Sequence, residues 1–425
     1  MPSLAKLAGL CVLAAAVAGV AGCGMPQRFD AVPSALAGAG QLLPIANSRF
    51  AGDDHVAFEQ ELRWAIRREN TAKGVPAPGA LLALSGGGED GAFGAGLLVG
   101  WSAHGTRPSF KIVTGTSTGA LVAPFAFLGS DFDATLERIY TKTEADDVIA
   151  DRTLLAAVAN DAMLDNTPLK RSIAKYIDPR VLDLIATEYH KGRLLLISTT
   201  NLDGGRSVVW NIGAIAASSH PRRLELVRKI MLASTAVPGM FPPVMLDVLV
   251  ESKPHQEMHV DGGTVSQVFV YPSSATLPDG FLHSRRGRPG VFVIRNGRIA
   301  PSAETVERRT LAIAGRAIET MIASNGLGDL YRIFATTQRD RIDFRLAMIE
   351  PDFTEPLYGR STGNTCAPCL HMAAARVDRA TVGATRHRAF ASSRVAGRWT
   401  LALNPWRAQP PGQGETHCAP AGSRI

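Results

Sequence analysis

The sequence lacks any dense cluster of positive charge. Its 45 Lys and Arg residues outnumber 38 Asp and Glu residues, for a formal net charge of +7, but they are scattered and not interleaved with aromatic residues. A surface that binds nucleic acid would gather these charges on one face. We therefore expect no nucleic-acid partner. The mild excess of positive charge suits an anionic membrane surface or simple solubility.

Cysteine is also scarce, with 5 residues in 425. Cys366 and Cys369 lie in the sequence CAPCLH, but haem attachment requires His directly after the second Cys, and Leu370 stands there. A structural zinc site needs four ligands, and only Cys418 or a distant His could complete one. We expect one disulfide among these three cysteines, in an oxidising compartment, and no metal site.

The first residues form a targeting signal. Lys6 supplies one positive charge, and the apolar run Leu7–Val20 is too short for a comfortable membrane span. The run ends in Val20-Ala21-Gly22-Cys23, which resembles the lipobox of bacterial lipoproteins, whose Cys becomes a lipid-carrying N-terminus. We expect residues 1–22 to be removed and Cys23 to anchor the chain, the alternative being an ordinary signal with Cys23 unmodified. Because Gly24 is not acidic, the resemblance favours the outer membrane of the cell envelope, facing the periplasm.

Composition divides the rest of the chain into three parts. Residues 23–75 begin as an Ala-, Gly- and Pro-rich tether, to about Asn47, and continue into a short amphipathic helix. Residues 76–350 alternate strand-like and helical patterns and form the main domain. In residues 351–425 the apolar periodicity fades, which indicates a poorly defined C-terminal tail.

The main domain begins with a repeated strand, turn and helix. Ala80–Leu84 is strand-like and precedes a helix at 92–104, and Lys111–Thr114 precedes a helix at 118–128. This order predicts an α/β fold, with a central, mostly parallel sheet and helices on its faces. Further on, Asp203-Gly204-Gly205 predicts a β-hairpin turn, and the apolar spacing predicts a long helix at about 303–323.

The glycine-rich segment LALSGGGEDGAFGAG directly follows the first strand and has three possible uses. A triphosphate-binding loop would place Lys and then Ser or Thr after the last glycine, where this chain has Ala92 and Phe93. A dinucleotide site would need an acidic residue at the end of the second strand, which instead runs into VTGTSTGA. The remaining use is an oxyanion hole, formed by the backbone N–H groups of Gly86, Gly87 and Gly88.

The sequence GTSTG matches the GxSxG pattern of a nucleophile elbow, between a predicted strand and a predicted helix. Gly115 and Gly119 flank Ser117, because a tight strand-to-helix turn leaves no room for side chains there. The helix N-terminus would favour the developing alkoxide of Ser117. Taken alone, this pattern also occurs in ordinary βα turns.

No histidine has a convincing setting as the base for Ser117. His255, His259 and His283 lie in or beside loops, and His371 and His387 lie in the tail. The motifs SGGGEDGAFGAG, GTSTGAL, ASTAVPGMFPPV and DGG occur in the order typical of the patatin-like phospholipase family, and residues 80 to 300 resemble it. That resemblance implies a three-layer fold and a Ser–Asp dyad without His.

The resemblance implies Ser117 as nucleophile, Asp261 as base and Gly86, Gly87 and Gly88 as oxyanion donors. Asp203, in a second Asp-Gly-Gly sequence, is a rival base, but its predicted position at a hairpin tip favours Asp261. A lone Asp must accept the serine proton and later return it, so burial that raises its pKa would help. Many family members carry Arg or Lys where this chain has Asp90, which puts a preference for anionic headgroups in doubt.

These observations predict a membrane-anchored lipid acyl hydrolase that needs no metal or organic cofactor. Its substrate would be a phospholipid, a lysophospholipid, a neutral glyceride or a thioester, and the motifs do not choose among these. Two other hypotheses are a non-catalytic lipid-binding lipoprotein that retains the fold, and a His-dependent α/β-hydrolase. The intact Ser, Asp and glycines argue against the first of these.

Overall fold

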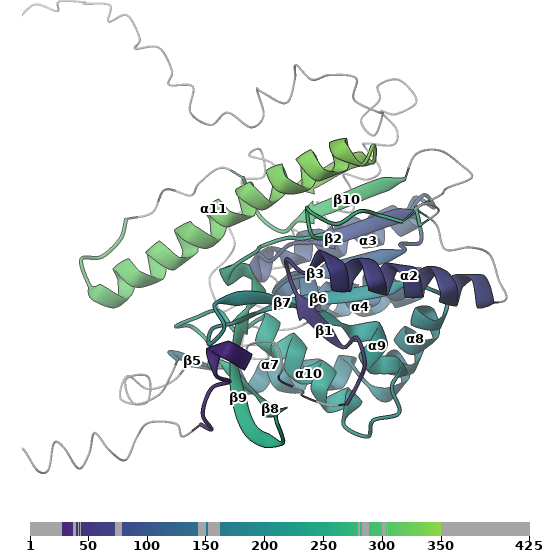
Figure 1. Cartoon of the computed structure of the whole chain (residues 1–425). Coiled ribbons are helices and arrows are strands. Elements are labelled where there is room, and N and C mark those ends of the chain that lie inside the picture. The colour runs from purple at the N-terminus through teal and green to yellow at the C-terminus, as the bar shows by residue number, and fades with distance from the viewer. Residues whose placement is uncertain are drawn as a thin grey trace, which may run out of the picture. The chain divides into compact units, whose positions relative to one another are not determined.

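A computed structural model describes residues 28–349 apart from 37–39, 41, 43, 73–78, 143–149, 152–161, 279–280, 283–288, 300–302 and 304. The predicted signal, the cysteines of the tail, His283, His371 and His387 lie outside the described residues. Figure 1 shows the arrangement of the helices and strands.

The centre of the main domain is a sheet with the strand order β1-β7-β6-β3-β2-β10-β11, and β9 pairs with β6 and β8. The strands are β1 (Arg49–Ala51), β2 (Ala80–Leu84), β3 (Ile112–Gly115), β6 (Leu194–Asn201), β7 (Arg206–Asn211), β8 (Val244–Val250), β9 (Lys253–Asp261), β10 (Gly290–Arg295) and β11 (Asp343–Met348). The five strands from β6 to β11 along this order are parallel, and β1, β7, β8 and β9 pair antiparallel. The predicted α/β fold with a mostly parallel sheet is confirmed.

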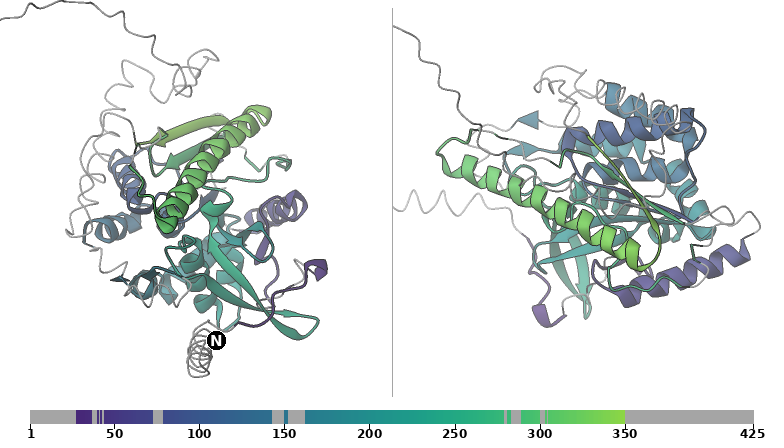
Figure 2. Two further views of the ribbon diagram at one scale, coloured as in Figure 1. Left: turned by 90° about the vertical axis from the view of Figure 1, so that its left-hand side faces the viewer. Right: turned by 90° about the horizontal axis from the view of Figure 1, so that it is seen from above.

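Helices cover both faces of the sheet, as a parallel sheet requires. Because successive side chains of a strand point to opposite faces, Leu82 and Leu84 of β2 join one apolar core and Leu81 and Ala83 join the other. The first core lies under α3 (Gly91–Ala103), α4 (Thr118–Leu128), α7 (Thr167–Tyr176), α8 (Pro179–His190) and α10 (Arg223–Ser234). The second lies under α2 (His55–Thr71) and part of α11 (Thr310–Arg339) (Figure 2).

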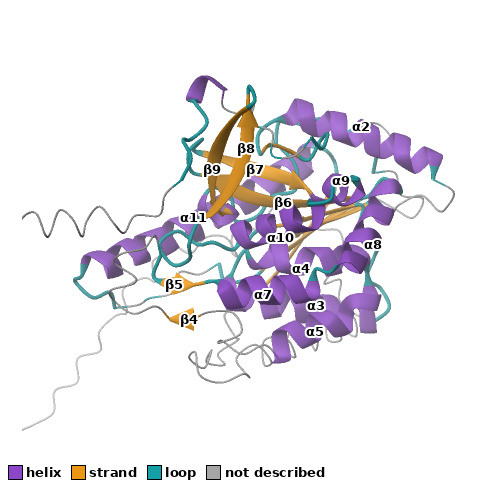
Figure 3. Ribbon diagram, turned by 90° about the horizontal axis from the view of Figure 1, so that it is seen from below, coloured by secondary structure: helices purple, strands orange, loops and turns teal. Residues whose placement is uncertain are grey.

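Shorter elements complete the described chain. They are the helices α5 (Asp133–Lys142) and α9 (Ile212–Ala217), the small β-ladder of β4 (Ala150–Asp151) with β5 (Leu164–Asp165), and 3-10 turns at Ser34–Leu36, Gly88–Asp90, Ser130–Phe132 and Gly262–Thr264. Figure 3 shows β8 and β9 standing beside the main sheet as a long hairpin.

Two segments differ from the sequence-based expectation. The long helix, predicted at about 303–323, begins at Thr310 and continues to Arg339. It runs through Gly326, a residue that usually weakens a helix, at a point where a Cβ would lie 3.2 Å from the Cβ of Gln267. Part of the predicted tether is bound to the domain, since the Gln256 N–H on β9 donates to the carbonyl of Asp30 at 3.1 Å. The hairpin predicted at Asp203 joins β6 to β7.

Candidate active site

Ser117 occupies a sharp turn between β3, which ends at Gly115, and α4, which begins at Thr118. Its backbone has φ 55° and ψ −127°, a conformation that costs free energy for a residue with a side chain. A Cβ at Gly115 would lie 2.5 Å from the carbonyl oxygen of Gly119, and a Cβ at Gly119 would overlap the Leu84 carbonyl. Both flanking glycines are therefore required for the turn to form.

The elbow is held by a residue from a distant helix. The Ser117 N–H donates to Ser234 Oγ at 3.0 Å, and Ser234 is fully buried at the end of α10. The neighbouring Thr116 Oγ1 lies 2.7 Å from Ser198 Oγ on β6. The motif containing Ser234 was recognised in the sequence, but the role of this residue was not, because only the fold brings α10 to the elbow.

Asp261 is the last residue of β9 and pairs in register with Thr199 of β6. Its Oδ1 accepts a hydrogen bond of 2.7 Å from the Gly263 N–H, whereas its Oδ2 is buried and has no hydrogen-bond partner of regular geometry among the described residues. Burial raises the pKa of Asp261 to about 7, and hydrogen bonding by the Ser117 hydroxyl and the Gly263 N–H opposes part of that rise. The structure therefore brings Ser117 and Asp261 together.

The three glycines of the predicted oxyanion loop differ in their hydrogen bonding. The Gly86 N–H donates to the Gln267 carbonyl at 3.1 Å and is thus occupied. Among the described residues, the N–H groups of Gly87 and Gly88 have no acceptor. A Cβ on Gly87 would overlap the Asn296 carbonyl, and Gly88 has φ 56°. The loop therefore presents Gly87 and Gly88 as open donors.

Asn296 holds this loop from the end of β10. Its N–H donates to Ser85 Oγ and its side-chain Nδ2 donates to the Ser85 carbonyl, both at 2.8 Å. Its Oδ1 accepts from the Gly94 N–H of α3 at 3.1 Å. Sequence analysis missed Asn296, which lies far along the chain from the glycines and in no recognised motif.

Gln267 is a second residue that sequence analysis missed. Its backbone N–H donates to Asp329 Oδ2 on α11 at 2.7 Å, and its side chain lies between Gly86 and Gly263. Its buried Oε1 has no hydrogen-bond partner within the described part of the chain. Gln267 thus connects the glycine loop, the turn that follows Asp261 and α11.

Asp90, where the family often has Arg or Lys, lies close to two guanidinium groups. Burial raises the pKa of Asp90, and the positive charges of Arg298 and Arg295 oppose that rise. Arg295 is the last residue of β10 and Arg298 lies three residues beyond it, so neither belongs to the glycine loop. Positive charge is therefore present near the loop, but Arg295 and Arg298 supply it, whereas the family pattern places a basic residue at position 90.

The two described histidines that we considered as bases do not reach Ser117. His259 is fully buried, with Nδ1 2.9 Å from Thr199 Oγ1 and Nε2 3.1 Å from Glu257 Oε2. Burial lowers the pKa of His259. His255 Nδ1 lies 3.2 Å from the Ala31 carbonyl. Both imidazole rings are therefore engaged in contacts that stabilise the fold, away from Ser117.

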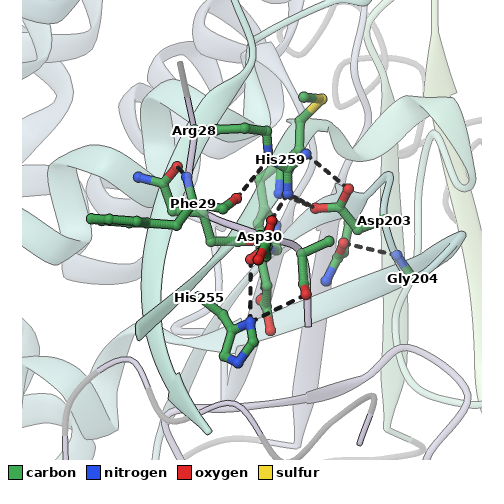
Figure 4. A network of polar contacts seen from close by, with 12 residues as sticks. Arg28, Phe29, Asp30, Asp203, Gly204, His255 and His259 are labelled. Atoms are coloured by element: carbon green, nitrogen blue, oxygen red, sulfur yellow. Dashed lines mark hydrogen bonds and ion pairs between the residues drawn. The ribbon is translucent and has the colours of Figure 1, made fainter. Parts of the chain in front are cut away.

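The rival base Asp203 is bound to the N-terminal segment. Arg28 donates to both of its carboxylate oxygens, at 2.9 and 2.8 Å, and the Met258 N–H donates to Oδ2 at 2.8 Å (Figure 4). Burial alone would raise the pKa of Asp203, but these hydrogen bonds hold it below its usual value. Asp203 therefore has the chemistry of a structural ion pair.

Among the described residues, no group of three or more His, Cys, Asp or Glu side chains is placed to hold a metal ion. The same residues include no helix with both the length and the apolar character of a membrane span.

Comparison with known proteins gives a family match inside the main domain. Residues 82–272 match the model of the patatin-like phospholipase family, which confirms the resemblance seen in the motifs. No curated protein matches the chain. Among solved structures, the crystal structure of VipD from Legionella pneumophila aligns with a TM-score of 0.36 and 11% identity, over 72% of this chain and 67% of that one.

Proposed function

We propose that this protein is a membrane-anchored lipid acyl hydrolase, a carboxylic ester hydrolase of the phospholipase A, lysophospholipase or esterase type. The observation that carries the proposal is the position of the buried Asp261 carboxylate beside the Ser117 hydroxyl, with a pKa raised by burial to about 7. A base with such a pKa is ionised near neutral pH and accepts a proton readily. The family match over residues 82–272 supports a lipid substrate.

In the proposed reaction, Asp261 accepts the proton of the Ser117 hydroxyl while Oγ attacks the ester carbonyl carbon. The N–H groups of Gly87 and Gly88 bind the resulting oxyanion, and Gly86 shapes the loop through its bond to Gln267. The protonated Asp261 then returns the proton to the leaving alcohol, and an acyl-Ser117 ester remains. Asp261 then takes a proton from water, which attacks the acyl carbonyl carbon. The bond to Ser117 Oγ breaks, Asp261 returns the proton to Oγ, and the fatty acid is released.

We propose that lipid on Cys23 anchors the enzyme to the outer membrane, where it faces the periplasm. The apolar run before Cys23 and the small residues that directly precede it support this part of the proposal. A lipid-carrying N-terminus would keep the active site close to a bilayer that contains acyl esters.

The test is hydrolysis of a panel of short-chain esters, lysophospholipids, phospholipids and glycerides by the purified chain, compared with Ser117→Ala and Asp261→Asn. We expect both substitutions to abolish turnover while circular dichroism shows an unchanged fold. Turnover that survives either substitution would place the chemistry elsewhere. No turnover by the unaltered protein on any ester would favour a non-catalytic lipid-binding protein.

A further inference from the structure

Asp329 on α11 is a buried carboxylate that the proposed reaction does not use. It is 2% exposed, and it lies beyond residues 82–272, the part of the chain that matches the family model. Its Oδ2 accepts the N–H groups of Gln267 at 2.7 Å and of Val268 at 3.3 Å. Its Oδ1 pairs with the largely exposed Arg332. Burying a carboxylate is costly unless such hydrogen bonds compensate, so the fold has placed Asp329 against these two N–H groups.

The peptide group between Gln267 and Val268 connects this carboxylate to the glycine loop. It contains the Gln267 carbonyl and the Val268 N–H, and it is planar and rigid. The N–H donates to Asp329, while the carbonyl accepts the Gly86 N–H at 3.1 Å. Because the group is rigid, the carboxylate that binds its N–H also fixes the direction in which its carbonyl points at Gly86.

The helix passes close enough for a short side chain to reach this peptide group. Gly326 lies one turn before Asp329, and a Cβ there would lie 3.2 Å from the Cβ of Gln267. Val268 and Leu330 are buried in the same apolar core. The contact between Asp329 and the peptide group is therefore built into the packing of α11 against the sheet.

The glycine loop has its supports directly before its open donors. Ser85 is held by Asn296 from the end of β10, and Gly86 is held by the peptide group after residue 267. Gly87 and Gly88 follow, and no residue in the described part of the chain accepts their N–H groups. An oxyanion donor is effective only when it points to the place where negative charge develops. The supports at Ser85 and Gly86 set that direction.

A second aspartate of α11 binds the same segment of chain without reaching the glycine loop. Asp340, at the C-terminal end of the helix, accepts the Tyr271 hydroxyl at 2.7 Å. Tyr271 lies four residues after Gln267, and no hydrogen bond within the described residues links it to Gly86. The chain thus provides a matched control for Asp329.

We infer that Asp329 is a positioning residue for the oxyanion loop. Through the peptide group that follows Gln267 it holds Gly86, and Gly86 directs the N–H groups of the next two glycines toward the oxyanion. Asp329 does this without touching the substrate. The inference rests on the proposed hydrolase function and adds to it a contribution from α11, outside the residues that match the family model.

The first experiment measures hydrolysis of a water-soluble short-chain ester by Asp329→Ala and Asp340→Ala. The oxyanion forms only in the transition state, so lost positioning should lower kcat and leave KM unchanged. We expect kcat of Asp329→Ala to fall about 10- to 100-fold, less than the loss from removing a donor outright, and kcat of Asp340→Ala to stay within about twofold. The midpoint of the pH profile should not move in either variant, because neither substitution touches Asp261.

Two further variants separate hydrogen bonding from charge. Asp329→Asn keeps an oxygen that can accept both N–H groups, so its kcat should stay within about threefold of the unaltered protein. Asp329→Glu keeps the charge and suits a helix, but its longer side chain displaces the carboxylate, so its kcat should fall. It also provides a folded test if the alanine variant does not fold. Loss of activity in the Asn variant with full activity in the Glu variant would overturn the inference in favour of a charge effect.

A trifluoromethyl ketone separates positioning from a loss of folded protein. When Ser117 attacks such a ketone an oxyanion forms, so the inhibition constant Ki reports on the oxyanion site of folded molecules alone. We expect Ki to rise in Asp329→Ala by about the factor by which kcat/KM falls. A Ki that stays at the value of the unaltered protein while kcat falls would mean that Asp329 acts on folding alone, and would overturn the inference.

Hydrogen exchange tests the contact itself, whether or not the protein hydrolyses an ester. Exchange in the glycine-loop peptide, followed by mass spectrometry, should be faster in Asp329→Ala than in the unaltered protein or Asp340→Ala, because the Gly86 N–H loses its fixed acceptor. Unchanged exchange in Asp329→Ala, or faster exchange with unchanged kcat and Ki, would overturn the inference. Faster exchange in a protein that turns over no ester in any form would instead contradict the proposed function, while supporting the role of Asp329 in holding the loop.

Discussion

The chain contains the tripeptide Asp-Gly-Gly twice, at the ends of two strands that pair with each other. Asp203 follows β6 and is bound by Arg28 and the Met258 N–H, which hold its pKa below the usual value. Asp261 ends β9 and is buried, and burial raises its pKa to about 7 although the Ser117 hydroxyl and the Gly263 N–H hydrogen bond to it. The same three residues therefore provide an ion pair in one place and a candidate base in the other. Burial and partners decide the chemistry of each carboxylate, not the local sequence.

The largest expected effect tests this contrast by activity. Asp261→Asn should lower kcat about 10²- to 10⁴-fold, the range typical for loss of a general base, because an amide cannot accept the serine proton. Asp203→Asn, the matched control in the second tripeptide, should retain kcat within about twofold. Ester hydrolysis measured for both variants beside the unaltered protein checks the pair. Similar losses in both variants would contradict the assignment.

The second prediction concerns the pH dependence of the rate. Asp261 acts as a base only when ionised, so kcat/KM should fall about tenfold per pH unit below a pH of about 7 and level off above it. Initial rates on a neutral, water-soluble ester, measured from pH 5 to pH 9 with fold checked at each value, test this. Asp203→Asn should show the same profile. A rate that stays constant down to pH 5 would show that the essential base has an ordinary carboxyl pKa.

The third prediction compares the glycines that follow the two aspartates. A Cβ on Gly262 would lie 2.7 Å from the Ser198 carbonyl oxygen, whereas a Cβ on Gly204 would have its nearest neighbour at 3.5 Å. Gly262→Ala should therefore lower the free energy of unfolding by about 1–3 kcal/mol through overpacking. Gly204→Ala should change it by less than about 0.5 kcal/mol. Urea unfolding of both variants measures these changes in the free energy of unfolding. Equal changes in the two variants would contradict the close packing around Gly262.

The smallest effect is the contribution of Asp203 to stability. Its folded pKa lies below the unfolded value, so its contribution is present above the unfolded pKa and is lost as pH falls through the folded pKa. Because the pair with Arg28 is partly exposed, Asp203→Asn should destabilise by no more than about 1 kcal/mol at pH 7. Thermal unfolding should show the difference between the two proteins shrinking toward pH 3. A difference that persists there would point to packing and not charge.

Much of the site was predictable because its motifs are local. A GxSxG sequence between a strand and a helix requires a sharp turn, and the structure places Ser117 in one at φ 55°. The choice of Asp261 over Asp203 followed from the hairpin signal at Asp203, which the structure confirms. Burial does raise the pKa of Asp261, which is the condition that a lone Asp base needs.

The residues that support the site were not predictable in this way. Ser234, Gln267 and Asn296 come from α10, from the loop after β9 and from the end of β10. None of them belongs to a pattern with a fixed spacing from Ser117. The occupied Gly86 N–H was missed for the same reason, because its acceptor is Gln267.

By itself, the sequence determined the first two strand–helix units, the elbow at Ser117 and the family match over residues 82–272, because each depends on residues close together in the chain. Only the tertiary structure decided which carboxylate is buried, which glycine N–H groups remain open and which residue of α11 supports the glycine loop. These properties depend on solvent exclusion and on partners that are distant in sequence. Spacing along the chain does not encode such contacts, and the packing of β6, β9, β10 and α11 creates them.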